Sequence, residues 1–237
     1  MILFNKNNFK SFDFILVAIL FGSQARGNPD IGSDLDLLLI INDMPFDRVI
    51  NAEKRFRQYN KNPMLNLCLQ TEKTFIKMKA KGSLFAKHLK CEGKIIYQRD
   101  KKNDIFVNIA NFTEHLKNIE LYLSLLTDCR LSLRQYGSNI YDLALLFTIC
   151  RNTCMVLCHK IGKPHFGRYD VYNCIKNEYP NRFPLSKQNY YTLSQFKMIY
   201  SRGIYLEIDI PSINESNKFI SSVQKLVEFG MELCSDG

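Results

Sequence analysis

The sequence lacks any uninterrupted apolar run long enough to cross a membrane as a helix. Its longest uninterrupted apolar run, Phe14 to Phe21, has eight residues, whereas a spanning helix needs about 20. The first ten residues also lack the basic-then-apolar order of a secretory signal. We therefore expect a cytoplasmic protein with reduced thiols and no membrane partner. Apolar residues themselves are not scarce, at 46% of 237 residues, which excludes intrinsic disorder.

The cysteines lack the spacing of a common zinc site. Cys150, Cys154 and Cys158 recur at every fourth position, which places them on one face of a helix. Structural zinc sites usually combine closely spaced cysteine pairs from two separate segments. Because free cysteine is among the most buried residue types, we favour a buried helical stripe. Metal binding by these three residues stays open as the alternative.

Strand and helix patterns alternate in the first part of the chain. Continuous apolar runs predict buried strands over 14–21 and 34–41. The period-two alternation of Leu65, Leu67 and Leu69 with polar residues predicts a half-buried strand over 64–70. Apolar spacing further predicts helices over 46–59, 71–79 and 83–91, and a last strand over 94–97.

Strand patterns nearly vanish after Asp104. The remaining periodicity predicts helices over 104–129, from Ser138 or Asn139 to about Ile161, and near 168–178, 187–202 and 213–234. Strands mixed with helices, followed by helices alone, predict an α+β chain. We expect a first domain at 1–103, with a small mixed sheet and helices, and an all-α helical bundle at 104–237.

The positive charge is concentrated in the first of these domains. The formal net charge is +9, of which residues 1–103 carry +8 and residues 104–237 carry +1. Seven lysines contribute to it within 22 residues: Lys73, Lys77, Lys79, Lys81, Lys87, Lys90 and Lys94. A solvated helix face is the ordinary interpretation of such a run. The functional interpretation is a surface that attracts phosphates of a nucleotide or RNA.

Two acidic residues follow a glycine–serine turn in the same domain. Gly22-Ser23 ends the first apolar run, and Asp34 and Asp36 stand at the start of the next predicted strand. A glycine backbone permits close approach by a ligand, and backbone N–H groups with a serine hydroxyl can hold phosphate oxygens. Strand alternation directs both aspartates to one face. Paired carboxylates beside phosphates predict a Mg²⁺ site.

This stretch resembles the minimal nucleotidyltransferases of the DNA polymerase β-like superfamily. Their motif is Gly-Ser, a loop and Asp-x-Asp on the next strand, and Ala25-Arg26-Gly27 also looks like their flanking residues. The resemblance covers about residues 14–98 and implies a small mixed sheet with helices on one side, often followed by a helical domain. It also implies that Gly22 and Ser23 hold the triphosphate of an NTP, ATP above all, with Arg26 facing it. Asp34 and Asp36 would be catalytic and bind Mg²⁺ or Mn²⁺.

The sequence departs from this family at a third carboxylate. Asn66 stands where the resemblance implies an aspartate that holds the catalytic metal and activates the acceptor hydroxyl. An amide can ligate a metal through its oxygen, but it cannot serve as a general base. Three accounts stay open. Another carboxylate (Glu72, Glu114 or Glu120) substitutes, a partner or substrate supplies the base, or the site binds nucleotide and turns over poorly.

We expect transfer of a nucleoside monophosphate from an NTP to an acceptor hydroxyl. An RNA end or a protein side chain, for example in a toxin–antitoxin pair, is the favoured acceptor. Polycationic aminoglycosides are disfavoured by the +8 domain but stay an alternative, as does a nucleotide-sensing module with a degenerate site. Arg168 and Tyr169, in a polar and aromatic loop, are candidate acceptor-side residues. An ordinary helix connection is the other interpretation of that loop.

Overall fold

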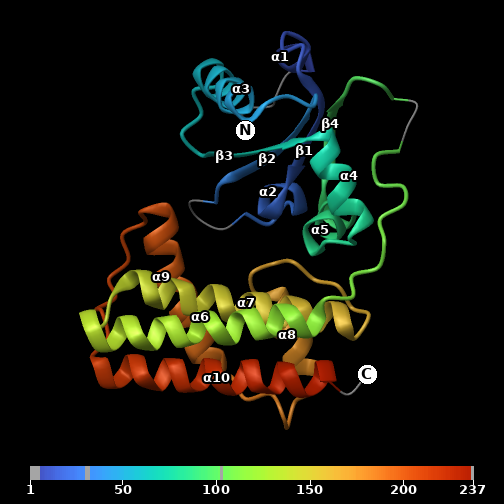
Figure 1. Cartoon of the computed structure of the whole chain (residues 1–237). Helices are drawn as coiled ribbons and strands as arrows, with labels where there is room; N and C mark the ends of the chain where they lie inside the picture. Colours follow the sequence, from blue (N-terminus) through green and yellow to red (C-terminus); the bar gives the residue numbers. More distant parts are fainter. Residues whose placement is uncertain (1–5, 30–32, 102–103, 236–237) are drawn as a thin grey trace. The chain divides into compact units, whose positions relative to one another are not determined.

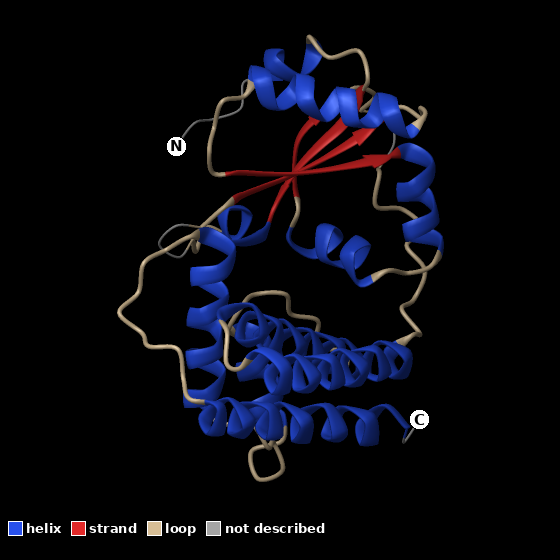
Figure 2. Cartoon of the chain, turned by 60° about the vertical axis from the view of Figure 1, so that its left-hand side comes forward, coloured by secondary structure: helices blue, strands red, loops and turns tan. Residues whose placement is uncertain are grey.

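A computed structural model describes residues 6–29, 33–101 and 104–235. Their contacts divide the chain into two compact units, one ending at Thr113 and one beginning at Glu114. The first unit contains the sheet and the second is helical, which confirms the predicted α+β class (Figures 1 and 2). The division falls after the predicted boundary at 103. Residues 102–103, at that boundary, lie outside the described residues.

A four-stranded mixed sheet forms the centre of the first unit. Its strands are β1 (Ile15–Phe21), β2 (Leu35–Ile41), β3 (Leu65–Thr71) and β4 (Lys94–Gln98). They lie in the order β3-β2-β1-β4, with β2 and β3 parallel and the other pairs antiparallel. The end of β1 therefore meets the beginnings of β2 and β3 at one edge of the sheet. That edge carries the glycine–serine turn and the acidic residues.

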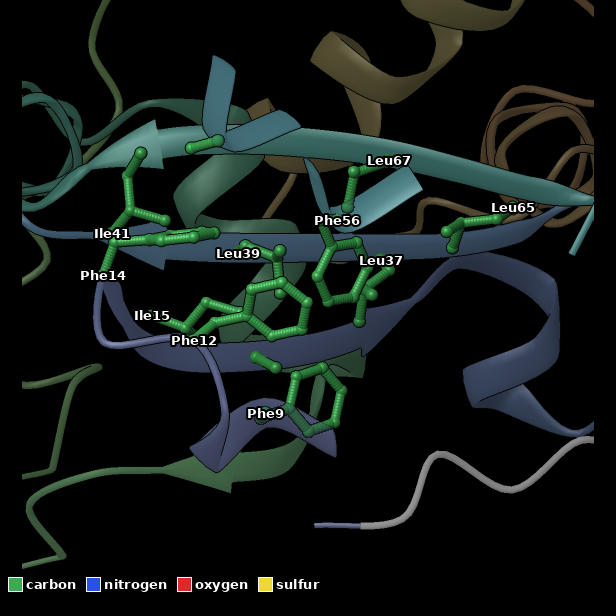
Figure 3. Packing of buried hydrophobic residues seen from close by; sticks show 12 residues of the cluster. Phe9, Phe12, Phe14, Ile15, Leu37, Leu39, Ile41, Phe56, Leu65 and Leu67 are labelled. Atoms are coloured by element: carbon green, nitrogen blue, oxygen red, sulfur yellow. The ribbon is translucent and has the colours of Figure 1, made fainter. Parts of the chain in front are cut away.

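Helices cover both faces of this sheet. On one face, Leu37, Leu39 and Ile41 pack with Phe9 of α1 (Lys6–Lys10) and Phe56 of α3 (Phe46–Tyr59) (Figure 3). The resemblance implied helices on one side only, and this expectation was wrong. The physical reason is that β1 and β2 are apolar at successive positions, so both of their faces must be buried.

The second face of the sheet is covered by α4 (Glu72–Ala80) and α5 (Leu84–Glu92). Leu38 and Ile40 point to this side and cluster with Phe75 of α4 and Leu89 of α5. Asp36 has the same strand parity as these two residues, because successive side chains alternate between faces. The side chain of Asp36 therefore lies on the α4–α5 face of the sheet.

The predicted helix over 104–129 is wrong in its first part, since the helix α6 begins only at His115. Residues 104–113 instead form an irregular segment, here called the strap, that runs along α4 and α5. The Lys79 ammonium donates to the carbonyls of Ile105 and Val107 at 3.0 and 3.3 Å, and Ala110 N–H donates to the Lys79 carbonyl at 2.9 Å. These bonds explain why the strap belongs to the first unit. They also make Lys79 a structural residue rather than part of an exposed positive surface.

The second unit contains five helices among the residues described. They are α6 (His115–Tyr136), α7 (Ile140–Lys160), α8 (Asp170–Glu178), α9 (Lys187–Arg202) and α10 (Ile213–Ser235). Asn139 caps α7 by accepting from Asp142 N–H at 2.9 Å, one of the two predicted caps. By length and composition alone α7 could span a membrane, but 61% of its most apolar window is buried. Because α7 packs against α6, α8, α9 and α10, it is the core helix of this unit.

The spaced cysteines of α7 line this core. Cys150, Cys154 and Cys158 are all fully buried, which confirms the predicted stripe. Burial raises the pKa of each of these thiols far above its usual value, so they are neutral at physiological pH. Within the ranges that the structure describes, no three His, Cys, Asp or Glu side chains gather as a metal site.

Candidate active site

Gly22 brings the backbone directly against an acidic side chain. It follows β1, has a φ of +72° and begins the short helix α2 (Gly22–Arg26). A Cβ at this position would lie 2.2 Å from Oδ2 of Asp36. Glycine is therefore required here for two reasons: it adopts a positive φ readily, and it has no Cβ to collide with Asp36. The sequence predicted a turn here, and the structure shows that the turn continues into one short helix.

Asp36 is on β2, which has β1 on one side and β3 on the other. It pairs with Phe21 on β1 and with Asn66 on β3. The Asn66 Nδ2 amine donates to Asp36 Oδ1 at 2.8 Å. Directly paired residues share a sheet face, so Asn66 occupies the position beside Asp36 at which the resemblance implied a third carboxylate. Its role stays a prediction.

Asp34 comes one residue before β2, where pairing with β3 begins. Leu35 N–H donates to the Met64 carbonyl at 2.8 Å. The neighbouring Ser33 is 1% exposed, and its Oγ has no hydrogen-bond partner among the residues described. A buried hydroxyl is normally satisfied, and a polar ligand beside Asp34 would supply the partner. Residues 30–32 of the preceding loop lie outside the described residues.

The residue types at this edge of the sheet suit a hard cation. Asp34 and Asp36 provide carboxylates, and rotation of the Asn66 amide would provide a neutral oxygen. Mg²⁺ prefers such oxygen donors and is usually bound by one or two carboxylates together with substrate phosphates. The residues present therefore fit Mg²⁺. Glu72, one of the carboxylates considered as a substitute for Asn66, is the first residue of α4, whereas Glu114 and Glu120 belong to the helical unit.

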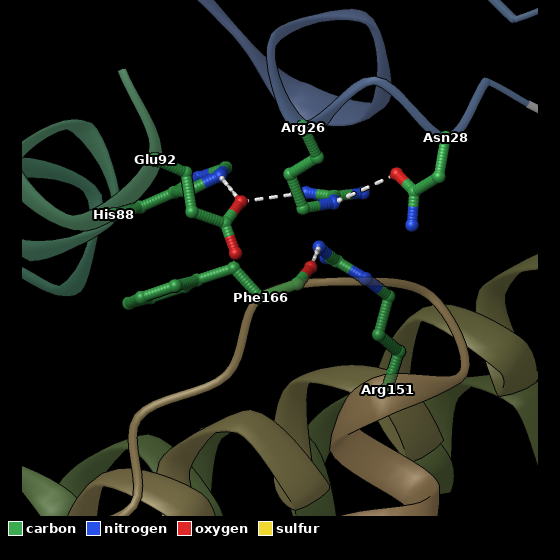
Figure 4. Close-up of polar contacts among 6 residues, drawn as sticks. All are labelled: Arg26, Asn28, His88, Glu92, Arg151 and Phe166. Carbon is green, nitrogen blue, oxygen red and sulfur yellow. Dashed lines mark hydrogen bonds and ion pairs between the residues drawn. The ribbon is translucent and has the colours of Figure 1, made fainter.

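Arg26, at the end of α2, is held by two acceptors (Figure 4). Its Nη1 amine lies 2.6 Å from Oε2 of Glu92, and its Nε–H donates to Asn28 Oδ1 at 3.3 Å. His88 Nε2 lies 2.9 Å from the same Glu92 oxygen. Burial raises the pKa of Glu92, but hydrogen bonds from His88 and Arg26 outweigh this effect and lower the pKa overall. Glu92 is therefore ionised at neutral pH.

Sequence reasoning missed His88 and Glu92. Their only local signal is the i, i+4 spacing, which places them on one face of α5. Their partner Arg26 is 66 residues away from Glu92 in the chain, and no short-range pattern predicts such a pair. Phe21, directly before Gly22, also contacts this helix, because its ring meets the His88 ring edge-on at 5.8 Å.

Arg168 and Tyr169, the candidate acceptor-side residues, are both held inside the helical unit. The Arg168 guanidinium lies over the Phe147 ring at 6.0 Å. Tyr169 stacks on Tyr191 with ring centroids 4.4 Å apart, and its hydroxyl lies 3.1 Å from that of Ser194. These contacts give both residues structural roles. Their acceptor-side role stays a prediction.

Comparisons with known proteins place this geometry in a family. Residues 5–102 match the family model "Polymerase beta, Nucleotidyltransferase". The fold is similar to a spectinomycin adenyltransferase from Enterococcus faecialis, whose structure contains ATP and spectinomycin. That match has a TM-score of 0.52 and 12% identity, and it covers 92% of this chain and 97% of the other.

Weaker likenesses add nothing to this assignment. A toxin–antitoxin structure with AMP-PNP matches at a TM-score of 0.31 and 14% identity, over 55% of this chain and 97% of the other, which is too low to carry an argument. No curated protein sequence matches significantly.

The family match coincides with the unit that contains Gly22, Asp34 and Asp36. Residues 5–102 therefore form a nucleotidyltransferase domain of the DNA polymerase β-like superfamily.

Proposed function

We propose that this enzyme transfers a nucleoside monophosphate from an NTP, with ATP as the first choice, to an acceptor hydroxyl. The observation that carries the proposal is the contact between Gly22 and Asp36. Because Asp36 Oδ2 occupies the space beside the Gly22 backbone, phosphates held at the Gly22–Ser23 turn would lie next to the carboxylates. Phosphoryl transfer depends mainly on such positioning and charge stabilisation.

Each residue of the site has a distinct task in this proposal. The Ser23 hydroxyl and nearby backbone N–H groups would bind the β- and γ-phosphates, and Arg26 would add a positive charge. Asp34 and Asp36 would hold Mg²⁺, which when bound neutralises the charge on the phosphates. The acceptor proton must leave to a group other than Asn66, because an amide is not a base. A base from the acceptor or a partner fits this requirement.

An anionic acceptor fits the charge of the domain best. Residues 1–103 carry a formal charge of +8, which favours an RNA end or a side chain on an acidic protein surface. A polycationic antibiotic would be repelled. The solved relative that contains spectinomycin shares only 12% identity with this chain, so the likeness concerns the fold and leaves the acceptor open to test.

The decisive experiment is label transfer. The full chain is incubated with Mg²⁺ or Mn²⁺, each labelled NTP, and either total RNA or cell lysate. We expect label on one macromolecular fraction, and loss of that label in the double variant Asp34→Asn plus Asp36→Asn. A matched control, Asp47→Asn plus Asp128→Asn, removes the same charge at two exposed positions and should transfer normally.

Two results would overturn this proposal. Transfer that survives the Asp34 and Asp36 substitutions would remove these residues from the metal site. Clear NTP binding by the wild-type protein without transfer from any NTP would replace transfer with nucleotide sensing. If RNA is the acceptor, its binding to the enzyme should weaken steeply between low and moderate salt. If a protein is the acceptor, the label should be found in the protease-sensitive fraction.

A further inference from the structure

The helix α5 holds the Gly22–Ser23 turn from both sides. Phe21, which precedes the turn, meets the His88 ring edge-on at 5.8 Å with an interplanar angle of 89°. Arg26, which follows it, pairs with Glu92 at 2.6 Å. His88 and Glu92 lie one helical turn apart and are joined to each other at 2.9 Å. One face of α5 therefore fixes both ends of the segment that the proposed function assigns to phosphate binding.

The contacts among Arg26, Glu92 and His88 are shielded from water. Their side chains are 20%, 16% and 13% exposed, respectively. Charge-assisted hydrogen bonds in such surroundings are stronger than those of fully exposed pairs. A single oxygen of Glu92 accepts from both neighbours, so His88 restrains the carboxylate that restrains Arg26.

The hydrogen-bond donors of Arg26 indicate that this arrangement suits an anionic ligand. Nη1 and Nε–H are bonded to Glu92 and Asn28, which fixes the plane of the guanidinium group. Its Nη2 amine makes no hydrogen bond to any residue that the structure describes. A guanidinium group held in this way presents an outer amine to an anion without losing further side-chain freedom on binding.

We propose that Glu92 is a positioning residue, which together with His88 holds Arg26 so that its outer amine meets the phosphates of the bound NTP. This inference rests on the function proposed above. Removal of Glu92 leaves the bond to Asn28 but gives the guanidinium group more freedom to move, so binding of the nucleotide costs more side-chain entropy. The chemistry at Asp34 and Asp36 does not involve Glu92. The effect should therefore fall on KM for the NTP and not on kcat.

The test compares Glu92→Ala, Arg26→Ala and the double variant in the label-transfer reaction, with the NTP concentration varied. We expect Glu92→Ala to raise KM for the NTP about tenfold, with kcat changed by less than about threefold. Because Glu92 acts through Arg26, the double variant should have the same KM as Arg26→Ala alone. Glu92→Gln, which keeps an acceptor oxygen, should restore part of the loss. Glu228→Ala, which removes a carboxylate at an exposed position on α10, should match the wild type.

Several outcomes would overturn this inference. An unchanged KM in Glu92→Ala, while the wild type transfers label, removes the positioning role and leaves the proposed function intact. Fully additive effects of the two substitutions show that Glu92 does not act through Arg26. A fall in kcat with unchanged KM assigns Glu92 to another task. If Glu92→Ala does not fold, as judged by thermal melting, Glu92→Gln and Glu92→Asp provide the same comparison. A wild-type protein that neither binds nor transfers any NTP overturns both proposals together.

Discussion

The amide of Asn66 on β3 donates a 2.8 Å hydrogen bond to the carboxylate of Asp36 on β2. The two residues are direct partners in the parallel strand pair. A carboxylate in place of Asn66 would face Asp36 at the same distance, and without a cation the two would repel each other. The amide therefore stabilises the ligand-free site, but it supplies less negative charge for a metal.

This relationship predicts the effect of Asn66→Asp. The added carboxylate should raise the affinity for Mg²⁺ or Mn²⁺ by about tenfold, as measured by calorimetry. The same substitution should lower the thermal midpoint in EDTA, because Asp36 then faces a like charge, and divalent metal should recover that loss. Asn66→Ala, which removes the hydrogen bond without adding charge, serves as the control. Equal metal affinity in wild type and Asn66→Asp would show that position 66 does not contact the metal.

Gly22 and Gly27 offer a matched pair of substitutions. Both have a positive φ, +72° and +79°, but a Cβ at Gly27 would have nothing within 4 Å, whereas one at Gly22 would collide with Asp36. Gly27→Ala should cost about 1–2 kcal/mol from the left-handed backbone alone. Gly22→Ala should cost more and should also weaken binding of Mg²⁺ with nucleotide, because Asp36 must move. Urea unfolding and nucleotide titration measure the two effects. Equal losses in both variants would contradict the importance of the Gly22–Asp36 contact.

The sequence predicted the acidic edge of the sheet because strand periodicity is a local property. Leu65, Leu67 and Leu69 alternate with polar residues, and this parity alone places Asn66 on a defined face of β3. The continuous apolar runs of β1 and β2 likewise gave their positions within one residue. That Asn66 pairs with Asp36 follows once the two strands are adjacent and parallel.

Two features could not be predicted, since each depends on partners distant in the chain. The pair Arg26–Glu92 spans 66 residues, and only the folded unit brings α2 next to α5. The strap was mistaken for helix because Ile105, Phe106 and Phe112 have a spacing compatible with one helix face. In the structure Ile105 and Phe106 pack on the α4–α5 face of the sheet instead. Contacts with Lys79 and Gly82 override the local pattern.

The lowered pKa of Glu92 predicts a pH dependence of stability. Burial alone would raise this pKa, but the hydrogen bonds from His88 and Arg26 bring it below its ordinary value of 4.5. A carboxyl group whose pKa is lower in the folded state stabilises the fold above its unfolded pKa, and this contribution is lost as the pH falls through the folded value. The wild type should therefore melt at a higher temperature than Glu92→Gln at about pH 6. The difference should shrink toward about pH 3.

Thermal melting of both proteins across this range measures that difference. A difference in midpoint that stays constant from about pH 6 to about pH 3 would show that Glu92 is not ionised against Arg26 in the folded protein.

The strap predicts that Gly82 is sensitive to substitution. Gly82 has a φ of +64°, and a Cβ there would lie 2.3 Å from the Asn111 carbonyl oxygen and 2.5 Å from that of Ala110. Backbone atoms cannot rotate away as side chains do, so Gly82→Ala must displace the strap from α4 and α5. Backbone strain and overpacking together should cost about 2–4 kcal/mol in the free energy of unfolding of the first unit.

Limited proteolysis distinguishes this mechanism from backbone strain alone. Displacement of the strap should expose residues 104–113 to cleavage, because their bonds to Lys79 are then lost. Gly203→Ala is the matched control, since Gly203 also has a left-handed backbone, with a φ of +60°, and has open space around it. This control should destabilise the protein through backbone strain alone, without new cleavage in the strap. If Gly82→Ala and Gly203→Ala are cleaved equally slowly between 104 and 113, the strap is held by its apolar residues Ile105 and Phe106 and not by the close approach at Gly82.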